Sequence, residues 1–87
     1  MTNYAVQLFD TTPNGSAGTY MIELYPPKRT KVYFSKEAFV SDLKERLGCS
    51  DRIVEGFLSN PSNPKMNNFI MDRPLSDEDV LYFGLQH

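Results

Sequence analysis

The chain has 87 residues, with nine lysines and arginines, eleven aspartates and glutamates and a net charge of −2, and 40% of its residues are hydrophobic. This balance is typical of a globular protein and excludes a strongly basic nucleic-acid binder, an acidic DNA mimic and a disordered chain. A chain of this size is expected to form one domain over residues 1–87.

The expected location is the cytoplasm. The apolar runs are short against the roughly 20 residues that span a bilayer, so no membrane association is expected. The N-terminus lacks the charged-then-apolar pattern of a signal peptide. Cys49 is the single cysteine and can form no intramolecular disulfide, so nothing indicates an oxidising compartment.

Two segments near the N-terminus alternate in the way that strands do. The first strand is predicted from Tyr4 to Phe9 and the second from Thr19 to Tyr25. One face of the first strand carries Tyr4, Val6 and Leu8, and the other carries Ala5, Gln7 and Phe9. One face of the second strand carries Tyr20, Ile22 and Leu24. The pair Asn14-Gly15 indicates a tight turn between them, and Pro26-Pro27 ends the second strand because proline donates no ladder hydrogen bond. Together these features predict an antiparallel hairpin.

The segment after the prolines is basic and leads towards a helix. Lys28, Arg29 and Lys31 form the basic cluster. A short third strand is predicted from Lys31 to Phe34, with Val32 and Phe34 directed inward.

Two helices in close succession, over 36–47 and 51–59, are the clearest predicted elements. Ser35 and Ser50 precede acidic first turns, where a serine oxygen accepts a hydrogen bond from a free helix N–H. Gly48 separates the helices, because glycine adopts the left-handed conformation at little steric cost. The apolar residues at helical spacing are Phe39, Val40, Leu43 and Leu47 on the first helix and Ile53, Val54, Phe57 and Leu58 on the second.

The C-terminal part is predicted to contain a loop over 60–68 and a short edge strand from Phe69 to Met71. Ser76 and the acids after it are typical of a helix cap, but the apolar run that follows favours a strand. We therefore predict a turn over 76–79 and a final strand from Val80 to Leu85.

The expected fold class is α+β, with an antiparallel β-sheet packed against a two-helix corner. The sheet is expected to combine the N-terminal hairpin with the C-terminal strands. This order is similar to the β-grasp arrangement, which also begins with a hairpin followed by a helix. Such an order indicates a fold and says nothing about function.

The sequence offers few residues for catalysis or metal binding. His87 is the single histidine and lies at the last position, where chain ends usually fray. Cys49 precedes a helix, where a thiol can be activated, but a small apolar residue that fills the helical corner is the favoured interpretation. Asp77, Glu78 and Asp79 are consecutive and do not converge easily on one ion. We therefore expect no enzyme, no cofactor and no metal site.

The favoured hypothesis is a non-enzymatic protein-interaction module, an inhibitor or regulator of a larger enzyme or nucleoprotein complex that acts by steric or competitive binding. It rests on the small size, the missing catalytic groups and an aromatic content of 13%. A phage or mobile-element protein fits this description, although no residue pattern indicates that origin. The expected contact residues are four aromatic anchors, Tyr20, Tyr25, Tyr33 and Tyr82, and three steering charges, Lys28, Arg29 and Lys31.

A helix-turn-helix DNA-binding regulator is the alternative, with its two helices over 36–47 and 51–59. Its contacts would come from Lys44 and Arg46 to phosphates and from Ser50 and Arg52 to bases. Asp51 and Glu55 on the second helix oppose phosphate contact, which dominates DNA affinity, so nucleic acid is a disfavoured partner. A homodimer that buries the tyrosine faces is a third hypothesis.

Overall fold

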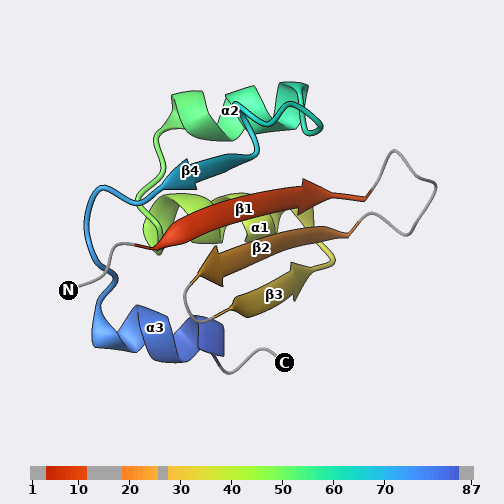
Figure 1. Cartoon of the computed structure of the whole chain (residues 1–87). Coiled ribbons are helices and arrows are strands. Elements are labelled where there is room, and N and C mark those ends of the chain that lie inside the picture. The colour runs from red at the N-terminus through yellow and green to blue at the C-terminus, as the bar shows by residue number, and fades with distance from the viewer. Residues whose placement is uncertain (1–3, 12–18, 26–27, 85–87) are drawn as a thin grey trace.

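The computed structural model describes residues 4–11, 19–25 and 28–84. The strands are β1 (Ala5–Asp10), β2 (Tyr20–Tyr25), β3 (Arg29–Tyr33) and β4 (Asn68–Ile70), and the helices are α1 (Lys36–Glu45), α2 (Asp51–Ser59) and α3 (Asp77–Gly84). The strands form an antiparallel sheet in the order β3-β2-β1-β4 (Figure 1). α1 lies behind this sheet in Figure 1, α2 lies beside β4, and α3 lies beside β3. The predicted α+β class is therefore confirmed, whereas a β-grasp-like arrangement is not established by these pairings.

The N-terminal hairpin is confirmed. β1 and β2 pair from Ala5 opposite Tyr25 to Asp10 opposite Tyr20. The inward residues are the ones that alternation predicts, and the four that are at most 1% exposed are Val6, Leu8, Ile22 and Leu24. The predicted turn pair at positions 14 and 15 and the prolines at positions 26 and 27 lie outside the described residues.

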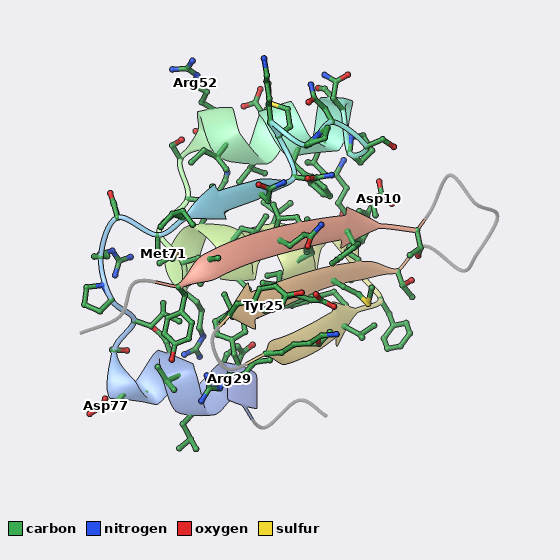
Figure 2. All side chains as sticks on the ribbon, viewed as in Figure 1. Asp10, Tyr25, Arg29, Arg52, Met71 and Asp77 are labelled. Atoms are coloured by element: carbon green, nitrogen blue, oxygen red, sulfur yellow. The ribbon has the colours of Figure 1, made fainter. Side chains whose placement is uncertain are left out.

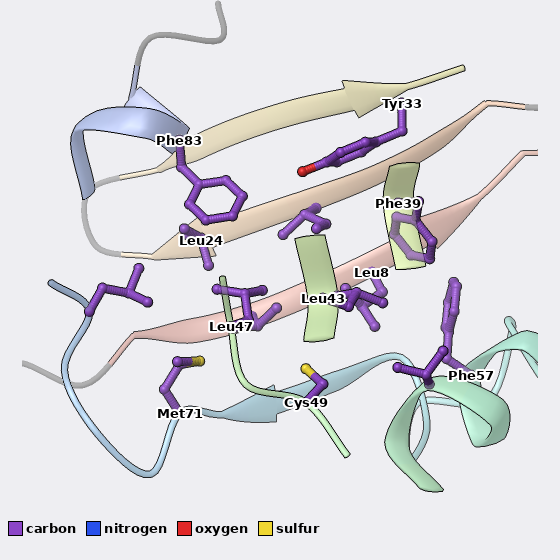
Figure 3. Close-up of a cluster of buried hydrophobic side chains, with 14 residues drawn as sticks. Leu8, Leu24, Tyr33, Phe39, Leu43, Leu47, Cys49, Phe57, Met71 and Phe83 are labelled. Carbon is purple, nitrogen blue, oxygen red and sulfur yellow. The ribbon is translucent and has the colours of Figure 1, made fainter. Parts of the chain in front are cut away.

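The core lies between the inward face of the sheet and α1, and side chains from α2 and α3 close its two ends (Figure 3). Phe39 of α1 is fully buried, and its ring stacks on Tyr20 with 4.9 Å between the ring centres. Phe57 of α2 is also fully buried, with its ring centre 5.7 Å from that of Phe39. Phe83 of α3 is 1% exposed. Burial of such a side chain contributes roughly 1.5–3 kcal/mol, so each helix is held to the sheet by at least one phenylalanine.

Both predicted starts of the helical pair are confirmed. The Ser35 hydroxyl accepts a hydrogen bond from the Ala38 N–H, and the Ser50 hydroxyl accepts one from the Ile53 N–H, each at 3.3 Å. These bonds satisfy backbone donors that have no partner inside the helix.

α1 ends at Glu45, two residues before the predicted end at position 47. Gly48 adopts a φ of 69°, in the left-handed region that the sequence predicts for it. The chain leaves the helix before the predicted end, and the Cys49 N–H donates to the Leu43 carbonyl at 2.9 Å.

The predicted inward face of the third strand is wrong by one residue. β3 covers Arg29–Tyr33, and Tyr33 opposes Tyr20 in the register with β2. Tyr33 is 4% exposed, whereas Val32 is 43% exposed and Phe34 is 79% exposed. A shift of one residue exchanges the two faces of a strand. Tyr33 takes the inward place because its hydroxyl finds an acceptor on α1, which neither neighbour could use.

The predicted final strand from Val80 to Leu85 is also wrong, because residues 77–84 form α3. The helix starts as the Ser76 and acid pattern indicates: the Asp79 N–H donates to the Ser76 hydroxyl at 3.2 Å. Helical spacing places Val80 and Phe83 on one face, and both pack against the core. Tertiary packing therefore overrides the strand preference of the apolar run.

The short strand predicted near Phe69 is confirmed as β4, which pairs with β1 at the sheet edge. Among the residues described here, no helix has the length and apolar character that crossing a membrane requires.

Candidate functional site

The basic cluster is divided between the two faces of the sheet. Lys28 is exposed, and its Nζ lies 3.7 Å from the Glu23 carboxylate. Arg29 turns towards α3 (Figure 2), and its Nη1 donates to the Tyr4 hydroxyl at 3.3 Å. The end of α3 passes close to Arg29, since a Cβ at Gly84 would lie 3.2 Å from Nε. Arg29 is thus partly enclosed by the fold, and Lys28 remains at the surface.

A polar cluster joins β3, α1 and α3, and we call it the tyrosine junction: Lys31, Tyr33, Asp42, Arg46 and Tyr82. Asp42 accepts hydrogen bonds from the Tyr33 hydroxyl at 2.5 Å and from the Tyr82 hydroxyl at 2.7 Å. The Lys31 Nζ lies 5.0 Å from the ring centre of Tyr33 and 5.1 Å from that of Tyr82. The Arg46 guanidinium carbon lies 3.8 Å from the Tyr82 ring centre. Three predicted contact residues, Lys31, Tyr33 and Tyr82, therefore meet in this cluster together with Arg46, a predicted phosphate contact. Their contacts are with other residues of the junction.

The tyrosine junction is not poised for acid–base chemistry. Burial raises the pKa of Tyr33, and the hydrogen bond to Asp42 raises it further. The pKa of Tyr82 is raised by burial and by the same acceptor. Both phenols therefore stay protonated near neutral pH, where they act as hydrogen-bond donors that fasten α3 to α1 and β3.

Cys49 has the character of a packing residue. Its side chain is 8% exposed and belongs to the core, and burial raises the pKa of its thiol to about 11. A thiol with that pKa is almost entirely protonated near neutral pH, so it is a poor nucleophile. This geometry supports the interpretation of Cys49 as an apolar residue at the helical corner.

The sheet face opposite α1 is crossed by no helix in Figure 1, and we call it the open sheet face. Its side chains form three rows across the strands. One apolar row contains Val32, Met21 and Phe9; a polar row contains Thr30, Glu23, Gln7 and Asn68; a second apolar row contains Tyr25, Ala5 and Ile70. Directly opposed side chains in neighbouring strands lie close enough to touch, so each apolar row is continuous.

Large apolar side chains are unusually exposed on this face. Phe34, the residue after β3, is 79% exposed, and Ile70 and Val32 are 67% and 43% exposed. Alternation along the strand assigns Phe34 to the side of Val32. A hydrophobic residue just before a helix cap often packs against the residue four positions into the helix, here Phe39. Phe34 does not do so, because Phe39 is fully buried in the core and Phe34 is largely exposed. The side chain of Phe34 therefore buries little apolar surface in the folded chain.

Sequence reasoning missed Val32 and Phe34 as surface residues. Val32, Tyr33 and Phe34 are three consecutive bulky residues, so alternation alone does not say which of them turns inward. The available signal is Asp42, nine residues after Tyr33, which supplies the acceptor for a buried phenol. Of the predicted aromatic anchors, Tyr25 lies on the open sheet face, and Tyr20 packs against the core.

The predicted nucleic-acid contacts are dispersed. The Lys44 Nζ lies 2.8 Å from Asp51, and the Arg46 Nη1 lies 3.0 Å from Asp79. Ser50 caps α2, and Arg52 extends from the start of α2 into solvent (Figure 2). Two of the four side chains therefore already neutralise carboxylates of this chain, which weakens a phosphate-binding surface.

Within the described ranges 4–11, 19–25 and 28–84, no group of three or more His, Cys, Asp and Glu side chains is arranged to hold a metal ion. No family model, curated protein or solved structure matches this chain.

Proposed function

We propose that this protein is a non-enzymatic interaction module that binds a larger protein through the open sheet face, as an inhibitor or regulator of an enzyme or nucleoprotein complex. The observation that carries the proposal is the exposure of Phe34, Ile70 and Val32 on a sheet face that no helix of the described residues covers. Val32 lies in one apolar row and Ile70 in the other, on either side of the polar row. Exposed apolar rows on a small protein mark an interaction site. Binding there would act sterically, by covering surface that another ligand of the partner needs.

The layout of the open sheet face supports binding to a protein. Burial of apolar surface contributes about 25 cal/mol per Å², so Phe34, the most exposed large side chain of this face, has the most to gain. Tyr25 adds a second aromatic residue of the kind that dominates interface energetics. Lys28 stands beside the face as an exposed charge, which suits steering towards an acidic partner surface.

A different protein is favoured over a second copy of this chain. Glu23 lies in the middle row of the open sheet face, and its side chain is only 12% exposed. A two-fold axis through the centre of the face would bring two Glu23 carboxylates together. Like charges that approach in a desolvated interface are destabilising, and Lys28, 3.7 Å from each carboxylate and largely exposed, offsets this only in part. A partner that adds a donor at this place fits better.

The remaining predicted contact residues have other roles in this proposal. Tyr33 and Tyr82 donate to Asp42, Lys31 lies against their rings, and Arg29 packs under the end of α3. Their replacement is expected to change binding indirectly, through the stability of α3. Tyr25 and Lys28 are the predicted residues whose replacement should change binding directly.

The test is affinity capture from source-cell lysate with nuclease treatment, comparing Phe34→Glu with Leu81→Glu. Leu81 lies on α3 and is 63% exposed, so it is a matched control for an added charge at an exposed apolar position. We expect a nuclease-resistant protein partner that the control retains and Phe34→Glu loses, with affinity for the purified partner lowered at least about tenfold.

Three outcomes would contradict the proposal. Equal capture by both variants would remove the open sheet face from binding. Loss of every partner after nuclease treatment would favour the DNA-binding alternative, with Arg52 as the residue to test next. A dimer in light scattering that Phe34→Glu dissociates would assign the face to a second copy of this chain.

A further inference from the structure

A second surface, distinct from the open sheet face, lies along the outer edge of β4. A hollow of about 380 Å³ opens between α2 and β4, and its lining includes Arg52, Ile53, Lys65, Met66 and Phe69. A smaller hollow of about 170 Å³ is lined by Ile53 and Phe69 as well and extends along the strand to Asp72. The two hollows adjoin at Ile53 and Phe69, and together we call them the β4 groove.

The backbone of β4 presents unused hydrogen-bonding groups on this side. The Leu8 N–H donates to the Asn67 carbonyl at 2.7 Å, and the Met71 N–H donates to the Tyr4 carbonyl at 2.8 Å. In an antiparallel ladder these bonds alternate along the strand, so the Phe69 backbone also faces β1. The N–H and C=O groups of Asn68 and Ile70 therefore point away from β1, towards the outer edge of the sheet, where the larger hollow separates β4 from α2. Such an edge is a template for another strand.

The groove combines this edge with an apolar floor. Ile53 is 37% exposed and Met66 is 39% exposed, and both line the larger hollow together with half-buried Phe69. An extended peptide that pairs with Asn68 and Ile70 would direct alternate side chains to opposite sides. One set of these side chains can then cover Ile53 and Met66.

The charge of the larger hollow selects the kind of peptide. Among the described residues that line it, Arg52 and Lys65 are the charged ones. Asp51, next to Arg52 in the sequence, is engaged by Lys44 at 2.8 Å. The larger hollow is therefore basic and complements carboxylates, whereas the lining of the smaller hollow includes the acidic residue Asp72.

We propose that the β4 groove binds an extended acidic segment of a partner protein, which adds to the sheet as a strand antiparallel or parallel to β4. Backbone hydrogen bonds to Asn68 and Ile70 supply affinity, and an apolar side chain over Ile53 and Met66 with a carboxylate near Arg52 supplies selectivity. This binding mode does not use Phe34, which lies beyond the end of β3 at the opposite edge of the sheet. Ile70 takes part in both surfaces, because its side chain lies on the open sheet face and its backbone faces the β4 groove.

The test uses a fluorescein-labelled peptide of about eight residues that alternates valine and glutamate, followed by fluorescence anisotropy. We expect saturable binding that Arg52→Glu weakens at least about tenfold, while Lys36→Glu, an exposed charge reversal on α1, leaves it unchanged. A peptide with N-methyl groups on alternate residues should lose binding, because it lacks the backbone donors of a strand. Amide resonances of residues 68–72 and 50–53 should shift in the nitrogen–proton NMR spectrum.

Each control can overturn the proposal. No saturable binding of the valine–glutamate peptide would reject the groove as a peptide site. Equal binding of the N-methylated peptide would exclude strand addition, and equal binding by Arg52→Glu would exclude the charge selectivity. Phe34→Glu should bind this peptide normally. A negative result for peptide binding therefore does not bear on partner binding by the open sheet face, and the reverse also holds. Displacement of the peptide by duplex DNA at physiological salt would assign the groove to nucleic acid.

Discussion

The Tyr82 hydroxyl on α3 donates a hydrogen bond of 2.7 Å to the Asp42 carboxylate on α1, across 40 positions of sequence. The Tyr33 hydroxyl on β3 donates to the same oxygen. One carboxylate thus connects three elements that approach each other only in the folded chain. The C-terminal helix is short, so contacts with the rest of the fold hold it in place. They include this connection, the ion pair between Arg46 and Asp79 at 3.0 Å and the burial of Phe83.

Replacement of Tyr82 by phenylalanine tests the first connection. The ring would remain against Arg46, but Asp42 would lose one of its donors. We expect the free energy of unfolding to fall by about 1 kcal/mol, the net worth of a partly exposed hydrogen bond to a charged group. Urea denaturation followed by circular dichroism measures this difference.

Tyr25→Phe is the matched control, because its hydroxyl donates to Glu23 at the sheet surface. A smaller loss is expected for this variant. Equal losses for the two variants would show that the bond to Asp42 has no special role in holding α3.

The pKa of Tyr33 predicts a loss of stability at alkaline pH. An unfolded tyrosine ionises near pH 10, whereas burial and Asp42 keep the Tyr33 phenol protonated to higher pH. Above pH 10 the unfolded state therefore binds fewer protons than the folded state, so the free energy of unfolding decreases as pH rises. Below pH 10 both states are protonated and the contribution is complete.

Urea denaturation at a series of pH values from 8 to about 11 measures this slope, and Tyr33→Phe should make it shallower. Absorbance at 295 nm should show that Tyr33 and Tyr82 of the folded protein ionise at higher pH than a tyrosine of the unfolded chain. An unchanged slope in Tyr33→Phe would contradict the assignment.

The sequence predicted the parts of the fold that local chemistry determines. Val6, Leu8, Ile22 and Leu24 alternate over whole strands, so their inward direction follows from spacing. Ser35, Ser50 and Gly48 act through the nearest backbone groups and mark the helical pair. These features need no information from distant residues.

The errors arise where consecutive bulky residues remove the periodic signal. Val32 to Phe34 and Val80 to Phe83 are such runs, and alternation or helical spacing fits each in more than one way. Asp42 distinguishes between these arrangements in each run, because it accepts hydrogen bonds from Tyr33 and Tyr82. The bond between Tyr82 and Asp42 can be recognised only in the folded chain. The sequence also did not predict the β4 groove, because the groove forms only where β4 and α2 lie side by side in the folded chain.

Cys49 is expected to react slowly with thiol reagents in the folded protein. Burial raises the pKa of its thiol from 9.0 to about 11, which lowers the thiolate fraction near neutral pH by about 100-fold. The rate of reaction with a chromogenic disulfide at pH 7.5, compared between native protein and protein in urea, measures this. Similar rates in the two states would show that Cys49 is accessible and would reopen a redox role.

Phe34→Ser should separate binding from folding. Phe34 is 79% exposed, so its removal is expected to change the free energy of unfolding by no more than about 0.5 kcal/mol. The same change should weaken binding of the partner, because the apolar surface of Phe34 becomes buried only in the complex. Thermal denaturation and binding affinity are measured on the same preparations, with Leu81→Ser on α3 as the control for an exposed apolar residue elsewhere. A loss of stability larger than that of the control would show that Phe34 supports the fold, and the open sheet face would then lose its main argument for binding.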